Sequence, residues 1–139
     1  MTESALSVLE EIRRFLPLGV TSVEADTSGM CLLGDRWLLR VNTNWRVTEG
    51  GRILMSPNLA REGSPFHGLE DLVGDEVVDV GIQGVAVKKD LYAVTREGRI
   101  LEIFSDFHYG EWLLSISGEG GGRGTPIFDL EGPVSEISP

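Results

Sequence analysis

The sequence predicts an α+β domain in which one N-terminal helix packs on a strongly bent antiparallel sheet, or a partly open barrel, built from two similar β-meanders. Three observations lead to this prediction. The first residues show helical apolar periodicity, the rest alternates with period two, and turn residues recur about every eight to twelve positions. The strand connections are too short for the crossovers that parallel strands require, so the strand order is antiparallel.

Size and composition point to one globular domain. The chain has 139 residues, of which 41% are hydrophobic and 24% charged, as is typical of a soluble protein. No run approaches the roughly 20 apolar residues that span a bilayer, and the first residues do not form a signal peptide. We therefore expect a cytoplasmic protein without a membrane partner. Cys31 is the only cysteine, which excludes an intramolecular disulfide bond.

Residues 2–16 predict an amphipathic helix. The acidic and basic side chains of this segment fall on one face, and Pro17 and Gly19 end the helix. The apolar face, which we expect to cover a sheet, comprises Ala5, Val8, Leu9, Ile12, Phe15 and Leu16.

The remaining chain up to residue 116 predicts two sets of strands. The first set is expected at residues 20–25, 30–33, 37–43, 45–48 and 53–56. A polar connection and one helical turn at 69–73 lead to the second set at 76–82, 85–87, 90–95, 99–106 and 111–116.

The two sets look like half-repeats, at about residues 19–56 and 74–116. Sliding the second onto the first superposes Leu101 on Leu39 and Ile103 on Val41, and a short insertion then brings Trp112 onto Trp45. We therefore assign residues 1–117 to a single domain. Chance similarity between two meanders is the alternative explanation.

Residues 118–139 are predicted to be a glycine-rich flexible segment and a C-terminal tail. The glycines at 120–124 lose much backbone entropy on ordering, which disfavours a regular element there. Ile127, Phe128 and Leu130 are expected to be able to dock as a short extended segment, on the domain or on a neighbouring copy. Free sheet edges favour pairing between copies, so a homodimer is one hypothesis, with residues 125–130 as a candidate exchanged strand.

The formal net charge of −10 excludes one class of partner and favours another. Nucleic-acid binding needs clustered Lys and Arg that neutralise phosphates, so we expect no nucleic-acid partner. A surplus of carboxylates favours a basic protein partner, or serves solubility alone.

No residue set predicts a reaction centre, a cofactor site or a metal site. Cys31 lies between apolar residues, where burial keeps a thiol unreactive. The three tryptophans predict core anchors, and the alternative is an aromatic contact surface. The loop before Trp112 is the best candidate position for acid and base chemistry, although such loops are also ordinary hairpin ends. The candidate interaction surface comprises Trp45, Arg46, Asp106, His108, Tyr109 and Glu111.

Several segments resemble small bacterial proteins of unknown function. These segments are LVGDEVVDV at 72–80, DLY at 90–92, EGRILEIFSD at 97–106, EWL at 111–113 and WRV at 45–47. The resemblance covers about residues 37–116. Proteins of this kind are often suspected to be immunity or accessory proteins beside secreted toxins, which implies a binding role and supplies no catalytic residues.

The leading hypothesis is thus a non-enzymatic, acidic protein-binding module of the immunity or accessory type. A small-ligand carrier or enzyme is the first alternative, and it requires a pocket of about 300 Å³ or more on the concave sheet face. A structural subunit of a larger assembly is the second, and exposed apolar residues on the N-terminal helix would favour it.

Overall fold

A computed structural model describes residues 5–26, 28–57, 67–83, 88–106, 110–117 and 126–135. Within these residues the helices are α1 (Ala5–Arg13) and α3 (His67–Glu70). The strands of the first half are β1 (Leu18–Gly19), β2 (Ser22–Asp26), β3 (Gly29–Gly34), β4 (Trp37–Val41), β5 (Asn44–Glu49) and β6 (Arg52–Met55). Those of the second half are β7 (Glu76–Gln83), β8 (Lys88–Thr95), β9 (Arg99–Phe104), β10 (Trp112–Ser117), β11 (Pro126–Gly132) and β12 (Val134–Ser135).

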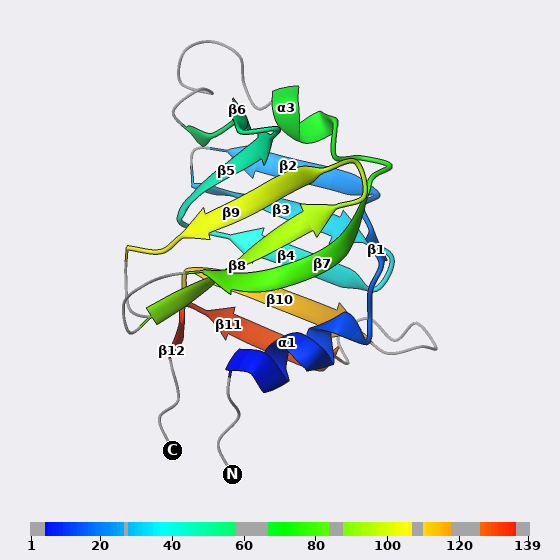
Figure 1. Ribbon diagram of the computed structural model, residues 1–139, viewed down its shortest axis with the longest axis vertical. Coiled ribbons are helices and arrows are strands. Elements are labelled where there is room, and N and C mark those ends of the chain that lie inside the picture. The colour runs from blue at the N-terminus through cyan, green and yellow to red at the C-terminus, as the bar shows by residue number, and fades with distance from the viewer. Residues whose placement is uncertain are drawn as a thin grey trace.

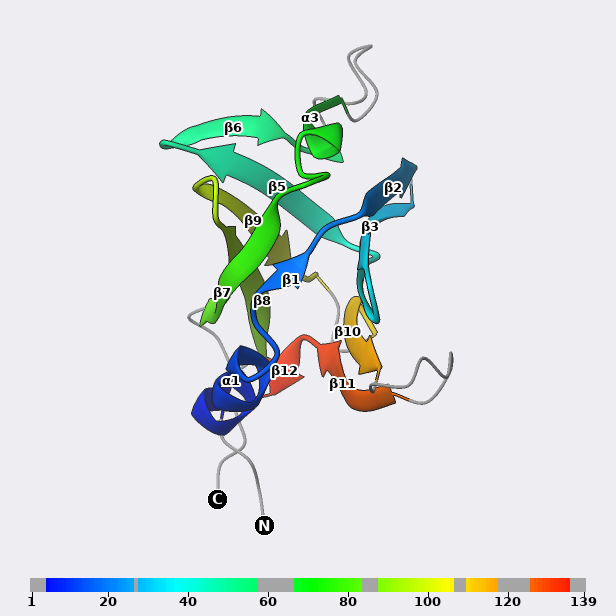
Figure 2. The same ribbon diagram turned by 90° about the vertical axis from the view of Figure 1, so that its right-hand side faces the viewer.

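The strands form two antiparallel sheets that face each other (Figure 1, Figure 2). The seven-stranded sheet has the order β1-β7-β8-β9-β5-β6, and β12 also pairs with β8. The five-stranded sheet has the order β11-β10-β4-β3-β2. Figure 2 shows the two sheets nearly edge-on, with α1 at one end of the space between them and α3 at the other.

Each half of the chain builds a three-stranded meander and then sends its next hairpin into the other sheet. Strands β2–β4 lie in the five-stranded sheet and β7–β9 in the seven-stranded sheet. The following strand crosses over in each half, so β5 pairs with β9 and β10 pairs with β4. Trp45 consequently stands opposite Ile103, and Trp112 stands opposite Val41.

Backbone hydrogen bonds extend the strand pairing within each sheet up to the points where the chain changes from one sheet to the other. The Asn42 amide donates to the Glu111 carbonyl at 2.8 Å, and the Glu111 amide donates to Gly132 at 2.9 Å. At a second corner, the Val20 amide donates to the Asp75 carbonyl at 2.9 Å and the Thr21 amide to Leu33 at 2.8 Å. Such sheet-switching strands form the corners of packed sheets without closing a barrel.

Helix α1 covers one open end of this sandwich. Val8 and Ile12 belong to the hydrophobic core, and Ile12 has no exposed surface. At the end of the helix, Arg13 Nε donates to Asp79 at 3.1 Å and Arg13 Nη2 to the Val80 carbonyl at 3.0 Å. The apolar stripe that the sequence predicts on this helix is therefore packed against the sheets.

The three tryptophans are core residues, as predicted from their strand positions. Trp37, Trp45 and Trp112 are 5%, 2% and 1% exposed. Trp37 Nε1 donates to the Gly19 carbonyl at 2.9 Å, and Trp112 Nε1 donates to Asp90 at 3.0 Å. These bonds satisfy indole donors that would otherwise be buried without a partner.

A glycine stands opposite an aromatic ring at three cross-strand positions. The pairs are Gly34 with Trp37, Gly81 with Tyr92, and Gly132 with Trp112. In each pair, a Cβ on the glycine would overlap the ring, with the nearest ring atom 1.8, 2.2 and 1.7 Å away respectively. The ring therefore occupies the space that the glycine leaves empty.

The structure agrees with an α+β fold made of antiparallel meanders and one N-terminal helix, and it corrects two finer predictions. The strands form two sheets that are not closed, rather than one bent sheet or a partly open barrel. The tail prediction for residues 118–139 also places the boundary too early, because β11 pairs with β10 of the same chain and Phe128 and Pro133 are buried. The predicted strand at 85–87 lies outside the described residues.

Replacing Gly132 with alanine should destabilise the fold by about 1–3 kcal/mol, because the new methyl group must displace the Trp112 ring. Gly19→Ala is the matched control, since a Cβ at Gly19 meets nothing within 4 Å. Urea denaturation followed by tryptophan fluorescence measures both variants. Equal stability of the two variants would contradict this packing.

Candidate functional site

The structure separates the members of the interaction surface predicted from the sequence. Trp45 lies in the core, so its ring is not available as an exposed contact, which corrects that prediction. Arg46, the next residue, lies on the outer face of the seven-stranded sheet. Its Nε donates to Glu102 at 2.6 Å, and its guanidinium carbon lies 4.9 Å from the centre of the Phe104 ring.

The loop before Trp112 does not bring its two described carboxylates together. Asp106 is exposed, whereas Glu111 is only 8% exposed. Asp106 lines a small polar hollow of about 200 Å³ with Asn42, Asn44 and the edge of Trp45, and Glu111 is not part of its lining. His108 and Tyr109 lie outside the described residues. The described part of this loop thus provides no acid and base pair.

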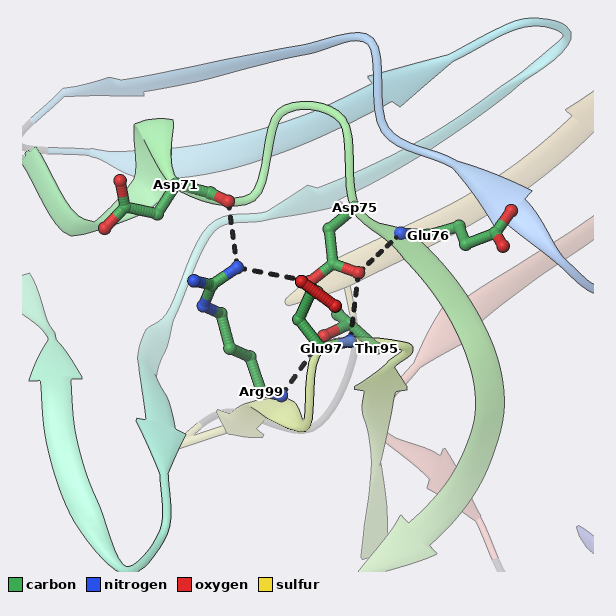
Figure 3. Close-up of polar contacts among 6 residues, drawn as sticks. All are labelled: Asp71, Asp75, Glu76, Thr95, Glu97 and Arg99. Atoms are coloured by element: carbon green, nitrogen blue, oxygen red, sulfur yellow. Dashed lines mark hydrogen bonds and ion pairs between the residues drawn. The ribbon is translucent and has the colours of Figure 1, made fainter.

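A dense polar cluster surrounds Asp75, next to the start of β7 (Figure 3). The Asp75 carboxylate is 1% exposed and accepts hydrogen bonds from the backbone amides of Glu76 at 2.8 Å and Glu97 at 3.2 Å. It also pairs with Arg99 Nη1 at 3.3 Å, which in turn donates to the Asp71 carbonyl at 3.0 Å. The cluster therefore ties β7 to the turn between β8 and β9 and to the segment after α3.

Hydrogen bonding decides the ionisation of Asp75. Burial acts to raise the pKa of the carboxyl group, but hydrogen bonds from Thr95, Glu76 and Glu97 and the charge of Arg99 together hold that pKa below its ordinary value of 3.8. A carboxylate that is ionised and already surrounded by donors is a poor general base. We assign the cluster a structural role.

The outer face of the five-stranded sheet combines apolar and acidic side chains, and we call it the acidic face. Leu33 on β3 lies beside Leu38 on β4, and Leu113 on β10 lies beside Arg40. Carboxylates occupy the flanking strands on both sides. The acidic face comprises Glu24, Asp26, Cys31, Leu33, Leu38, Arg40, Leu113, Asp129 and Glu131.

The leucines of the acidic face belong to the surface rather than to the core. Leu33, Leu38 and Leu113 are half-buried, and they alternate along their strands with the buried residues Leu32, Leu39 and Leu114. Figure 2 shows no helix over the outer side of β3, β4 and β10.

The charges of the acidic face are unbalanced. Glu24 and Asp26 lie on β2, Asp129 and Glu131 lie on β11, and all four are exposed. Arg40, between them, is the one cation in the outward rows of this sheet that the structure describes. The face therefore presents a stripe of three half-buried leucines, interrupted by Arg40 and Ser115, between two acidic borders.

Cys31 lies in the middle of the acidic face and is half-buried, which corrects the prediction of a core position. Partial burial, and then the neighbouring Glu24, raise the pKa of its thiol against the opposite effect of Arg40. The thiol consequently stays protonated at neutral pH and is not an activated nucleophile.

Sequence reasoning missed the acidic face because its apolar residues occur in continuous runs. The runs MCLL at 30–33 and WLL at 37–39 do not show which residues point outward. The outward positions follow only once the cross-strand register is known. The Asp and Glu residues at alternate positions of β2 and β11 were the signal that the sequence offered.

No group of three or more His, Cys, Asp or Glu side chains suited to a metal ion occurs in the part of the chain that the structure describes. None of the described helices is long and apolar enough to cross a membrane. Comparisons of the chain with protein-family models, curated proteins and solved structures give no match.

Asp75→Asn should lower the free energy of unfolding by about 2–4 kcal/mol near neutral pH, because it leaves Arg99 without its buried counter-charge. The native carboxyl group has the lower pKa, so its stabilisation is present above about pH 4 and is lost as the pH falls through the native value. The difference between the parent protein and the variant should shrink accordingly.

Urea titrations at several pH values between neutrality and pH 3 measure this difference. Asp71→Asn is the control, since Arg99 bonds the backbone carbonyl of Asp71 and not its carboxylate. A constant difference across the pH range would argue against an ionised Asp75 in the native state.

Proposed function

We propose that this chain is a non-enzymatic protein-binding module that docks a basic protein on the acidic face, in the manner of an immunity-type inhibitor or accessory protein. The observation that carries the proposal is the half-buried stripe of Leu33, Leu38 and Leu113 between two acidic borders. Apolar centres with polar rims are the usual anatomy of protein interfaces.

The electrostatics of the acidic face favour a basic partner. Four exposed carboxylates border the stripe, and the whole chain carries a net charge of −10. Opposite charge on the partner would steer its approach and raise the association rate. An inhibitor of this kind would cover a cationic groove without needing a reaction centre of its own.

Helix α1 gives little support to the alternative of a purely structural subunit. That reading requires exposed apolar residues on the helix, whereas Val8 and Ile12 are buried in the core. A small-ligand carrier has one observation in its favour, a cavity of about 480 Å³ lined by Phe15, Leu18, Trp37 and Ile116. Its volume lies in the range of small-molecule sites.

The docking proposal predicts that charge reversal on the acidic face abolishes partner capture. Glu24→Lys combined with Glu131→Lys should lower capture from an extract of the source cells by at least about tenfold, because it reverses one charge on each border. Glu10→Lys combined with Glu70→Lys makes the same change of net charge at exposed positions off the face and should leave capture unchanged.

The immobilised chain and both variants are compared by quantitative mass spectrometry of the captured proteins. Capture of the specific partner should also fall when salt rises from about 50 to about 500 mM, because salt screens surface charges. Recovery of no partner at either salt concentration, or equal loss in both double variants, would count against the proposal.

The small-ligand alternative predicts a raised melting temperature in a thermal-shift screen of aromatic and aliphatic acids, with a smaller shift in Phe15→Ala. A flat response across the screen would remove this alternative.

A further inference from the structure

The outer face of the seven-stranded sheet is a second surface with different chemistry, and we call it the β5–β9 face. Two of the exposed large hydrophobic residues lie on it, Ile53 at 51% and Phe104 at 37% exposure. Ile100 lies opposite Thr48, which in turn lies opposite Ile53. The β5–β9 face comprises Arg46, Thr48, Ile53, Ile100, Glu102 and Phe104. Figure 1 shows no helix over β5, β8 and β9 on this side.

The charges of the β5–β9 face are already paired. Arg46 and Glu102 stand directly opposite each other on β5 and β9 and are 2.6 Å apart. The Arg46 guanidinium also covers the Phe104 ring. The face is therefore apolar and nearly neutral in its centre, although the chain as a whole is strongly acidic.

The two ends of the β5–β9 face differ. A shallow hollow of about 410 Å³ lies at one end, lined by Arg46, Thr48, Gly51, Ile53, Ile100 and Glu102. The exposed Phe104 ring stands at the other end, four residues along β9 from Ile100, or about 13 Å at the rise of a β-strand. An exposed ring and a hollow at opposite ends of one surface can meet each other across two copies related by a two-fold axis.

We propose that a second copy of this chain docks on the β5–β9 face around a two-fold axis near the Arg46–Glu102 pair, with Phe104 of each copy in the hollow of the other. This contact is isologous, so it closes as a dimer and does not extend into a filament. The exchange of residues 125–130 is not needed for it, since β11 pairs with β10 within one chain.

Charge selects a second copy for this face and a different protein for the acidic face. Two β5–β9 faces meet without excess charge, because each brings one Arg46–Glu102 pair. Two acidic faces would place eight carboxylates against two guanidinium groups, and like charges in contact oppose association. The net charge of −10 on each copy still repels at long range, and salt screens this repulsion.

Sedimentation equilibrium tests the dimer over a protein concentration of about 1 to about 300 μM, a range suited to small interfaces. The parent protein should dimerise, and dimerisation should strengthen as salt rises. Phe104→Lys and Ile53→Lys should each weaken it at least about tenfold, because both bury a charge in the contact. Val73→Lys is the matched control, since Val73 is 47% exposed and lies outside the face.

Circular dichroism and thermal melting establish that each variant is folded, and Phe104→Ala replaces Phe104→Lys if the latter is not. The proposal would be overturned if the parent protein stayed monomeric at every protein concentration, at low and at high salt. A dimer that persists in the Phe104 and Ile53 variants, or one lost equally in Val73→Lys, would also overturn it. None of these outcomes bears on capture by the acidic face, which is tested with other variants and weakens with salt.

Discussion

The structure depends on the pairing of each half of the chain with the other half. Strand β5 pairs with β9 and β10 pairs with β4, so the hairpin that ends one half completes the sheet of the other. Trp45 and Trp112 lie at these two joints, each buried and each opposite a β-branched residue of the other half. Neither meander can bury its inner face without the partner sheet, which makes the fold one cooperative unit.

The hydrogen bonds of two carboxylates, Asp75 and Asp90, reinforce this pairing at the two ends of β8. The chain returns to the seven-stranded sheet at β7 after the α3 segment, and the Asp75 cluster ties the start of β7 to the turn between β8 and β9. The Asp90 carboxylate has a similar position at the other end of β8, where it accepts hydrogen bonds from Ser105 and Trp112. The buried Asp75 and the partly buried Asp90 thus hold strands of distant sequence together.

The sequence predicted the parts of this fold that depend on local pattern. The helix stripe of Val8 and Ile12, the core role of the tryptophans and the antiparallel meanders all follow from periodicity and short connections. The crossing of β5 and β10 into the opposite sheets did not follow, because strand pairing across some 56 residues leaves no local signal. The C-terminal segment was predicted only in part for a related reason. The glycines at 120–124 suggested a flexible end, and the sequence left open whether the segment after them docks on the domain or on a neighbouring copy. The register of β11 with β10 places it on the same chain.

The candidate site was harder to predict than the fold, because it depends on which side of a strand faces outward. Trp45 and Arg46 are neighbours in sequence, yet one fills the core and the other lies on the surface. The same rule assigns Leu38 and Leu39 to opposite sides of β4. Because both inner faces are used for the core, the two outer faces are the large surfaces left for partners. Their side chains differ in kind: one is apolar with internally paired charges and the other is apolar with an acidic border. Two surfaces on opposite sides of one sandwich do not overlap, so a second copy and a basic protein could be bound at the same time without competing for the same residues.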